Sequence, residues 1–165
     1  TGKNSYNDSS NIITINRLDR RSPETQSINN NYSHNDRPRP PDFMPQGMLT
    51  SRTVAMPRDT NTHGDIFGGW LMSQMDLAGG VAAGQRAKGR IVTVAVEKMV
   101  FHLPVKVGNV VSCYADVIKV GRTSITVKIE VWAQRHDDLD EPAKVTEGIF
   151  TYVALDKNRR PRAVM

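Results

Sequence analysis

The stretch NTHGDIFGGW (61–70) contains a carboxylate, an imidazole and three glycines ahead of a tryptophan. The glycines at 68 and 69 come where the following residues take a helical pattern. A helix start offers free backbone N–H groups and partial positive charge to an oxyanion. Asp65 lies close enough upstream to face whatever those groups bind, and a carboxylate beside such donors is sufficient for hydrolysis, as general base or as nucleophile. By spacing alone, an acid at this place is slightly more often a helix cap.

Other kinds of catalytic site find little support in the sequence. His63 is a lone loop histidine, which is more often exposed than catalytic. With Asp65 and Asp76 it makes no metal-ligand set of suitable spacing, so no metal is expected. Ser73 lacks a GxSxG elbow, Cys113 has the position of a small core residue in a strand, and no GxGxxG or P-loop occurs. Among the catalytic chemistries considered, hydrolysis with the Asp65 carboxylate as base or nucleophile is left, beside the helix-cap interpretation.

The elements that must position this stretch follow from hydrophobic periodicity. Helical spacing predicts a helix over 70–88 with Gly89 as its stop, and its buried face is expected to hold Leu71, Met75, Ala78 and Ala82. Strands are predicted at 50–56, 91–101, 109–120, 124–132 and 143–156. Because the links between strands are short, the pairing should be antiparallel. The predicted order is a strand, a long helix and a meander of four strands.

One sheet and one helix can hide their apolar faces only if the sheet curls around the helix. Gly79, Gly80 and Gly84 each cost about 1 kcal/mol relative to alanine inside a helix. A sheet packed tightly against the helix backbone would account for them. On the strand 124–132 the alternation leaves Lys128 and Trp132 facing outward, available for contacts.

The composition is that of one folded domain together with a segment that does not contribute to its core. The chain has 165 residues, of which 38% are hydrophobic. Residues 1–47 are rich in Asn, Ser and Pro and are predicted to be a disordered tail, and residues 48–165 form the domain. The single cysteine excludes an intramolecular disulfide framework and fits a reducing compartment. No membrane-spanning run or signal-peptide block is apparent, so we expect a soluble, cytoplasmic protein without a membrane partner.

The positive charge is mild and scattered. The net charge is +5, with six basic against five acidic residues in 1–47 and sixteen against twelve in the remainder. The sequence has no run of Lys and Arg of the kind that binds a phosphate backbone, so no nucleic-acid partner is expected. The densest patch, NRRPR (158–162), suits a small phosphorylated ligand as well as it suits RNA.

Three stretches carry a family resemblance: NTHGDIFGGWLMSQMDLAGG, RIVTVAVEKMVFHLPVKVGNVVSCY and KVGRTSITVKIEVW. They resemble the YciA-like acyl-CoA thioesterases of the hot-dog-fold superfamily, in order and without large gaps over about 50–162. The string GDIFGGW-MSQMD is highly specific, whereas F–P–VG (101–108) is a looser feature shared across hot-dog enzymes. The resemblance implies an α+β, hot-dog fold, with a long central helix wrapped by a curved antiparallel sheet of about five strands.

The resemblance also implies an activity and its residues. The reaction is hydrolysis of fatty acyl-CoA thioesters to free CoA and a carboxylic acid, with no cofactor, since CoA belongs to substrate and product. Asp65 falls on the catalytic aspartate, and the resemblance implies catalytic roles for Asn61 and Gly69 as well. The substrate-binding residues that it implies around the thioester are Thr60, His63, Gly64, Ile66, Phe67 and Gly68. The turn that matches the family's GRSS-type turn along the CoA arm is Gly121, Arg122, Thr123 and Ser124. The basic side chains expected to hold CoA phosphates are Arg122 with Arg90, Lys106 or Arg159.

The departures from the family pattern are modest. Asn is frequent in relatives at the position of His63, which argues against an essential role for this histidine. Asn109 replaces an aspartate at a turn that should tolerate it. The tail has no counterpart in the family core.

The resemblance further implies a homodimer with shared active sites, often assembled into a hexamer as a trimer of dimers. The run RIVTVAVE (90–97) would be a long apolar sheet edge in a lone subunit, and such an edge needs covering. Two alternatives stay open. One is another hot-dog enzyme, an enoyl-CoA hydratase/dehydratase or an acyl-carrier-protein thioesterase. The other is a non-catalytic protein, either one that binds acyl-CoA or a nucleic-acid-binding module that uses the basic C-terminus.

Overall fold

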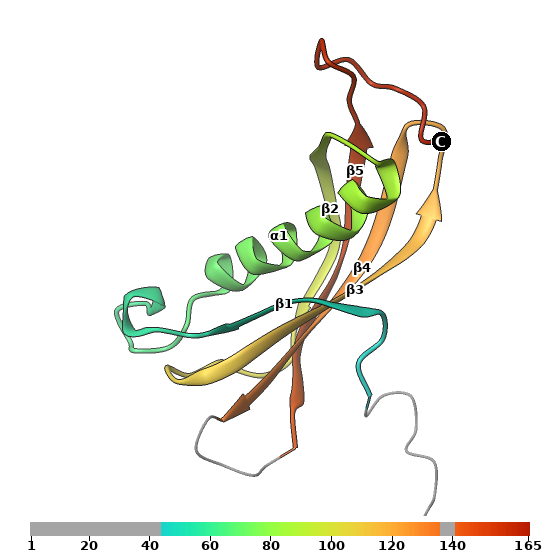
Figure 1. Ribbon diagram of the computed structural model, residues 1–165. Helices are drawn as coiled ribbons and strands as arrows, with labels where there is room; N and C mark the ends of the chain where they lie inside the picture. Colours follow the sequence, from blue (N-terminus) through green and yellow to red (C-terminus); the bar gives the residue numbers. More distant parts are fainter. Residues whose placement is uncertain (1–43, 136–140) are drawn as a thin grey trace, which may run out of the picture. The chain divides into compact units, whose positions relative to one another are not determined.

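The computed structural model describes residues 44–135 and 141–165, and Figure 1 shows one helix lying across one face of a sheet. The elements in chain order are β1 (Met48–Val54), the 3-10 helix η2 (Pro57–Asp59), α1 (Gly68–Ala87), β2 (Ile91–Phe101), β3 (Asn109–Val120), β4 (Ser124–Arg135) and β5 (Ala143–Ala154). A single helix packed on a five-stranded antiparallel sheet confirms the predicted fold class. No helix among the described residues is long and apolar enough to cross a membrane.

The sheet order is β1-β3-β4-β5-β2, which corrects the predicted meander. Strands β3, β4 and β5 do follow one another, but β2 pairs with β5 and lies at an edge. The reason lies in the link 102–108. The His102 N–H donates to the Val145 carbonyl (2.8 Å), and the buried Val105 accepts from the Ile66 N–H (3.1 Å). The link therefore packs against β5 and the segment before α1 instead of making a hairpin between β2 and β3.

The core lies between α1 and the inner face of the sheet. All four residues predicted for the buried face of the helix are buried, since Leu71, Met75, Ala78 and Ala82 are each at most 6% exposed. They pack in one apolar cluster with the inward side chains of β4, which are Ile125, Val127, Ile129 and Val131. The alternation read from the sequence therefore located the face of β4 that supports the helix.

The three helix glycines do not share one explanation. A Cβ on Gly79 would lie 2.3 Å from the Tyr152 hydroxyl oxygen and 2.6 Å from Ile129 Cδ1, so close packing against the sheet requires glycine there, as predicted. For Gly80 and Gly84 the prediction is wrong within this chain. The nearest atoms to a Cβ at these two positions lie at 3.9 and 3.8 Å, which is ordinary van der Waals contact.

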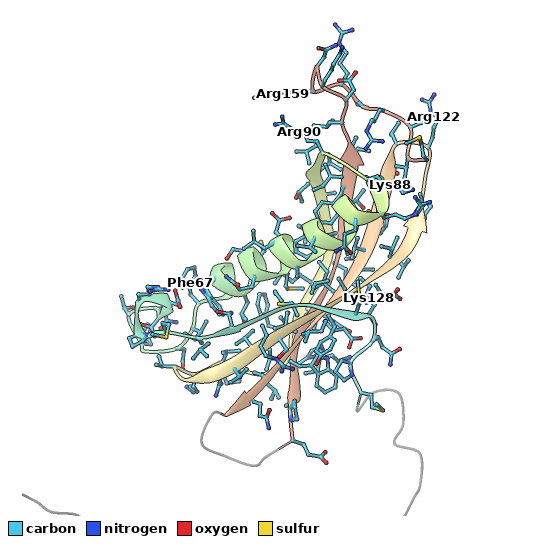
Figure 2. The ribbon with its side chains drawn as sticks, viewed as in Figure 1. Phe67, Lys88, Arg90, Arg122, Lys128 and Arg159 are labelled. Carbon is cyan, nitrogen blue, oxygen red and sulfur yellow. The ribbon has the colours of Figure 1, made fainter. Side chains whose placement is uncertain are left out.

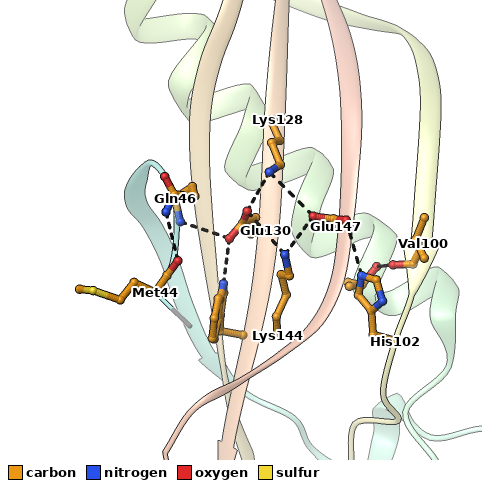
Figure 3. A network of polar contacts seen from close by, with 10 residues as sticks. Met44, Gln46, Val100, His102, Lys128, Glu130, Lys144 and Glu147 are labelled. Atoms are coloured by element: carbon orange, nitrogen blue, oxygen red, sulfur yellow. Dashed lines mark hydrogen bonds and ion pairs between the residues drawn. The ribbon is translucent and has the colours of Figure 1, made fainter. Parts of the chain in front are cut away.

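The strand boundaries were predicted closely, and the surroundings of Trp132 were not. Strands β2 and β3 have the predicted bounds, whereas β4 continues to Arg135 and β5 ends at Ala154. Trp132 faces away from the helix as predicted but is only 4% exposed, so it is not available for contacts. Its indole N–H donates to Glu130 Oε2 (3.1 Å), inside a polar network on the outer face of the sheet (Figure 3).

The described end of the predicted tail, 44–47, belongs to the folded domain. The Gln46 N–H donates to Glu130 Oε2 (3.2 Å). Gly47 has φ +92°, and a Cβ there would lie 2.6 Å from the Ala115 backbone, so only glycine allows the chain to approach β3 this closely. Residues 46 and 47, which the sequence assigned to the tail, therefore contact β4 and β3. The rest of the predicted tail, 1–43, lies outside the described residues.

Candidate functional site

The loop before α1 holds Asp65 through backbone contacts organised by Asn61. The Asn61 side-chain oxygen accepts the N–H groups of His63 (2.9 Å) and Asp65 (3.1 Å), and the Asn61 N–H donates to the Asp65 carbonyl (2.7 Å). Gly64 adopts φ +83° at the tip of this turn, which favours glycine. The Asp65 backbone is thus fixed at both its N–H and its carbonyl. Asn61 acts as a loop organiser in this arrangement, since its carboxamide oxygen faces the loop backbone.

The Asp65 carboxylate does not cap the helix. The N-cap of α1 is Phe67, which makes no side-chain cap hydrogen bond. Asp65 lies two residues further upstream, half-exposed, and its Oδ1 contacts the Lys106 ammonium. Within the described chain, Oδ2 has no hydrogen-bond partner and is open to a water molecule. The helix-cap interpretation of Asp65 is therefore wrong, because the carboxylate contacts Lys106 and not the helix N–H groups.

The first residues of α1 present unpaired backbone donors. The N–H groups of Trp70 and Leu71 donate to the Phe67 carbonyl, at 3.0 and 3.4 Å. Among the described residues, no acceptor is recorded for the N–H groups of Gly68 and Gly69. Two N–H groups at the positive end of a 20-residue helix are suited to a developing oxyanion.

Two phenyl rings explain why the helix starts with glycines. A Cβ on Gly68 would lie 3.1 Å from the Phe101 ring, and one on Gly69 would lie 3.1 Å from the Phe67 ring. Larger residues would push these rings away from the helix start. The pair Gly68–Gly69 therefore opens α1, as the sequence indicated, and packs between two aromatic side chains.

An apolar groove adjoins this helix start. The residues that line it are Ile66, Gly68, Leu71, Phe101, His102, Leu103, Pro104 and Val105. Except for Ile66 and Gly68, none of these was predicted for the site. In the sequence these residues fall on or near the F–P–VG pattern at 101–108, which resembled the family but was given no functional role. Sequence reasoning also grouped Lys106 with the phosphate-binding residues, whereas the structure places its ammonium at Asp65.

The remaining loop residues have mainly structural contacts. The Thr60 hydroxyl donates to the Pro57 carbonyl (2.8 Å), and Thr60 bridges to Ile66, which is buried. His63 is exposed, and its ring lies 3.5 Å from the Thr62 hydroxyl. Phe67 is half-exposed, with its N–H donating to the Asp59 carbonyl (3.3 Å). These contacts hold the segment that presents Asp65.

The residues predicted for the CoA phosphates gather at the other end of α1. Figure 2 shows Arg90, Arg122 and Arg159 near the C-terminal end of the helix, and Phe67 at its start. A 20-residue helix is about 30 Å long. The turn that contains Gly121, Thr123 and Ser124 lies with this basic end, because the Thr123 carbonyl accepts from the Ala154 N–H (2.9 Å). The structure thus separates the predicted site into two groups within one chain.

No group of three or more His, Cys, Asp or Glu side chains in the described ranges is arranged to hold a metal ion. Cys113 is buried in β3 as predicted for a core residue. Burial raises the pKa of its thiol, while a hydrogen bond with Ser51 opposes this shift. The thiol therefore stays protonated at neutral pH and is a poor nucleophile.

Comparisons with known proteins agree with this architecture. A profile of the thioesterase superfamily matches residues 63–139. The acyl-CoA thioester hydrolase YciA of Salmonella typhimurium is 54% identical over 123 residues, covering 73% of this chain and 92% of that protein. A hexameric thioesterase from Yersinia pestis superposes with a TM-score of 0.71 at 52% identity, covering 74% of this chain and 99% of the other. A hexameric broad-specificity acyl-coenzyme A thioesterase superposes with a TM-score of 0.70 at 51% identity, covering 74% and 84%.

Proposed function

The chain belongs to the thioesterase superfamily, among the acyl-CoA thioester hydrolases of the YciA group, and we propose that it hydrolyses fatty acyl-CoA thioesters to CoA and a carboxylate. The observation that carries the proposal is the half-exposed Asp65 carboxylate, held just upstream of two unpaired helix N–H groups. An apolar groove beside the same helix start offers room for the thioester.

In the proposed reaction the thioester carbonyl oxygen accepts from the Gly68 and Gly69 N–H groups. The free Oδ2 of Asp65 takes a proton from a water molecule, whose oxygen attacks the carbonyl carbon. The negative charge that develops on the carbonyl oxygen is stabilised by the helix start. Collapse of the tetrahedral intermediate breaks the C–S bond, and the CoA sulfur takes up the proton that Asp65 had removed from the water molecule. The alternative, in which Asp65 attacks directly and water hydrolyses the resulting anhydride, uses the same groups.

We further propose that each active site is shared by two subunits paired through β2. This strand is a sheet edge, and Val92, Val94 and Val96 are exposed along it. Its last residue, Phe101, packs at the start of α1, and its first residue follows the helix end. A two-fold axis through antiparallel β2 strands would set the helix start of one subunit near the basic helix end of the other. This arrangement would join the two groups that one chain keeps apart.

Two broader features complete the proposal. The related thioesterases from Yersinia pestis and Campylobacter jejuni are hexameric, and we propose that dimers of this chain assemble further into a trimer of dimers. The reducing cytoplasm suits an acyl-CoA enzyme with one buried, unpaired cysteine. No metal or cofactor takes part in the proposed reaction.

Substitution of Asp65 tests the proposed function. Asp65→Asn keeps the size of the side chain but removes the proton acceptor and the nucleophile, so we expect kcat for acyl-CoA hydrolysis to fall by roughly a hundredfold or more. The measurement is release of free CoA thiol across a panel of short- to long-chain acyl-CoAs. The matched control is Asp116→Asn, an exposed acid on β3, which should hydrolyse at the wild-type rate. A folded Asp65→Asn protein with wild-type turnover would show that the assignment is wrong.

A further inference from the structure

The guanidinium of Arg162 joins two parts of the chain at the C-terminal end of α1. Its Nη2 donates to the Ala87 carbonyl at the helix end (2.6 Å), and its Nε donates to the Leu155 carbonyl just beyond β5 (3.1 Å). Its Nη1 donates to the carbonyl of its neighbour Ala163 (3.1 Å). A Cβ on Gly89 would lie 2.9 Å from Nη2, so glycine there leaves room for the guanidinium. All three nitrogens of this side chain are used on backbone carbonyls.

Backbone hydrogen bonds extend the same connection to the two turns that carry predicted phosphate ligands. The Leu155 N–H donates to the Arg90 carbonyl (2.9 Å), and the Val164 N–H donates to the Arg122 carbonyl (2.8 Å). The Arg162 N–H itself donates to the Ala154 carbonyl (2.9 Å). Arg162 thus lies between the anchoring points of Arg90 and Arg122. Loss of its side chain would release the helix end from the segment that holds both turns.

The surface that Arg162 supports has the chemistry of an anion site. A groove there is lined by Lys88, Gly89, Arg90, Leu155, Asp156, Lys157, Arg162 and Met165. Its one acidic member, Asp156, is occupied locally, because its Oδ1 accepts the N–H groups of Asn158 (2.8 Å) and Arg160 (2.9 Å). Four basic side chains against this one carboxylate leave the lining of the groove with a net positive charge.

Two residues at this end of the molecule have left-handed backbone conformations. Lys88 (φ 50°) and Arg159 (φ 63°) are the two non-glycine residues with positive φ in the described ranges, and both are basic. Left-handed conformations of such residues persist only where the surrounding structure enforces them. Rigid anchoring matters for binding, because a turn that is ordered before the ligand arrives needs no ordering when it binds.

We propose that Arg162 is a positioning residue for the CoA phosphates: it fixes the turns that present Arg90 and Arg122 without itself binding a phosphate. This inference rests on the proposed function, since it concerns the nucleotide part of the same substrate. It distinguishes Arg162 from its basic neighbours, because its donors already have acceptors. The geometry of the guanidinium, rather than its charge, is what the proposal requires.

The test compares Arg162→Lys and Arg162→Met with the wild type on two substrates. One substrate is an acyl-CoA, and the other is the matching S-acyl-N-acetylcysteamine, a thioester without a nucleotide. A lysine keeps the charge but cannot reach three carbonyls, so both variants should raise KM for acyl-CoA by about tenfold, as loss of a charge-assisted hydrogen bond would. Both should retain kcat and hydrolyse the nucleotide-free thioester as the wild type does. Arg58→Met, a charge loss at the exposed Arg58 of η2, is the control and should leave both KM values unchanged.

Three other results would contradict the positioning role or the proposed function. If Arg162→Lys matches the wild type while Arg162→Met does not, the charge is what acts, and the positioning role is wrong. Equal losses on both thioesters would also contradict it, since they would reflect general damage to the fold. If Arg162→Met does not fold, Arg162→Lys carries the test, with its melting temperature as the check on folding. A wild-type protein that hydrolyses neither thioester would instead refute the proposed function.

Discussion

Glu130 shows how a buried charge is held on the outer face of the sheet. Its side chain is 2% exposed, yet Lys128 Nζ lies at 2.9 Å, and the N–H groups of Gln46 and Trp132 donate to Oε2. Burial by itself would raise the pKa of this carboxyl. The hydrogen bonds from Lys128, Gln46 and Trp132 outweigh burial, so the pKa lies below its ordinary value. Asp65 differs in being half-exposed, with one carboxylate oxygen open to water.

A pH-dependent contribution to stability follows from the lowered pKa of Glu130. The ionised carboxylate stabilises the fold above the unfolded pKa of about 4.3, and this contribution is lost as the pH falls through the lower folded pKa. Glu130→Gln should therefore lower the free energy of unfolding by roughly 1–3 kcal/mol at neutral pH. The difference from the wild type should shrink at acidic pH. Urea unfolding at both pH values measures it.

The control for this prediction is Glu97→Gln. The Glu97 side chain is exposed and accepts one hydrogen bond from Thr151, so its replacement should change stability little at either pH. A Glu130→Gln protein as stable as Glu97→Gln at neutral pH would contradict the role given to the buried network.

At the scale of elements, α1 approaches the sheet most closely at one residue, Gly79. The Tyr152 hydroxyl reaches the helix at Gly79 and donates to the Asp76 carbonyl (3.1 Å). Burial and the neighbouring Asp76 carboxylate raise the pKa of this hydroxyl, which therefore stays protonated and can donate. Thr93 donates to the same carboxylate (2.6 Å), which fastens β2 to the helix. The helix position thus depends on Gly79 much more than on the other helix glycines.

Alanine at two adjacent helix positions tests this point. Gly79→Ala would force Tyr152 and Ile129 to move, so we expect it to lower the free energy of unfolding by about 1–3 kcal/mol. Gly80→Ala meets no close atom in the chain and should be neutral or stabilising by up to about 1 kcal/mol. Thermal and urea unfolding compare the two variants with the wild type. Equal stability of the two variants would refute the explanation given for Gly79.

At the scale of the whole molecule, the candidate catalytic group and the basic groove lie at opposite ends of α1. Because α1, about 30 Å long, separates the two groups within one chain, a second copy is the simplest way to complete the proposed site. The exposed apolar edge β2 offers the surface for that copy, because an uncovered edge strand tends to pair. The proposed dimer therefore explains the edge and the separation together.

Mixing two inactive variants tests whether sites are shared. One subunit carries Asp65→Asn, and the other carries Arg90→Met with Arg122→Met. A mixed dimer then contains one native site, made from the intact Asp65 of one subunit and the intact arginines of the other. After dissociation and random reassociation, we expect about a quarter of the wild-type activity at low substrate concentration. Activity no greater than the sum of the separate variants would contradict the shared site.

The sequence by itself determined the elements and the core face of α1, and it proposed a location for the chemistry. Periodicity is a local property, so β2 and β3 could be bounded correctly, and the buried side of the helix could be named residue by residue. The stretch 61–70 correctly located the helix start at Gly68 and Gly69. Its spacing alone left Asp65 between a helix cap and a catalytic group, and the family resemblance favoured the catalytic role.

Only the tertiary structure decided which distant residues meet. It paired β2 with β5, placed Lys106 on Asp65, and buried Trp132 and Glu130 beneath contacts that include Gln46. It also placed Phe67, two residues after Asp65, at the opposite end of α1 from Arg90 and Arg122 (Figure 2). None of these follows from spacing, because contacts between segments far apart in the chain depend on packing free energy summed over the whole fold. The pattern of a single segment does not contain that sum.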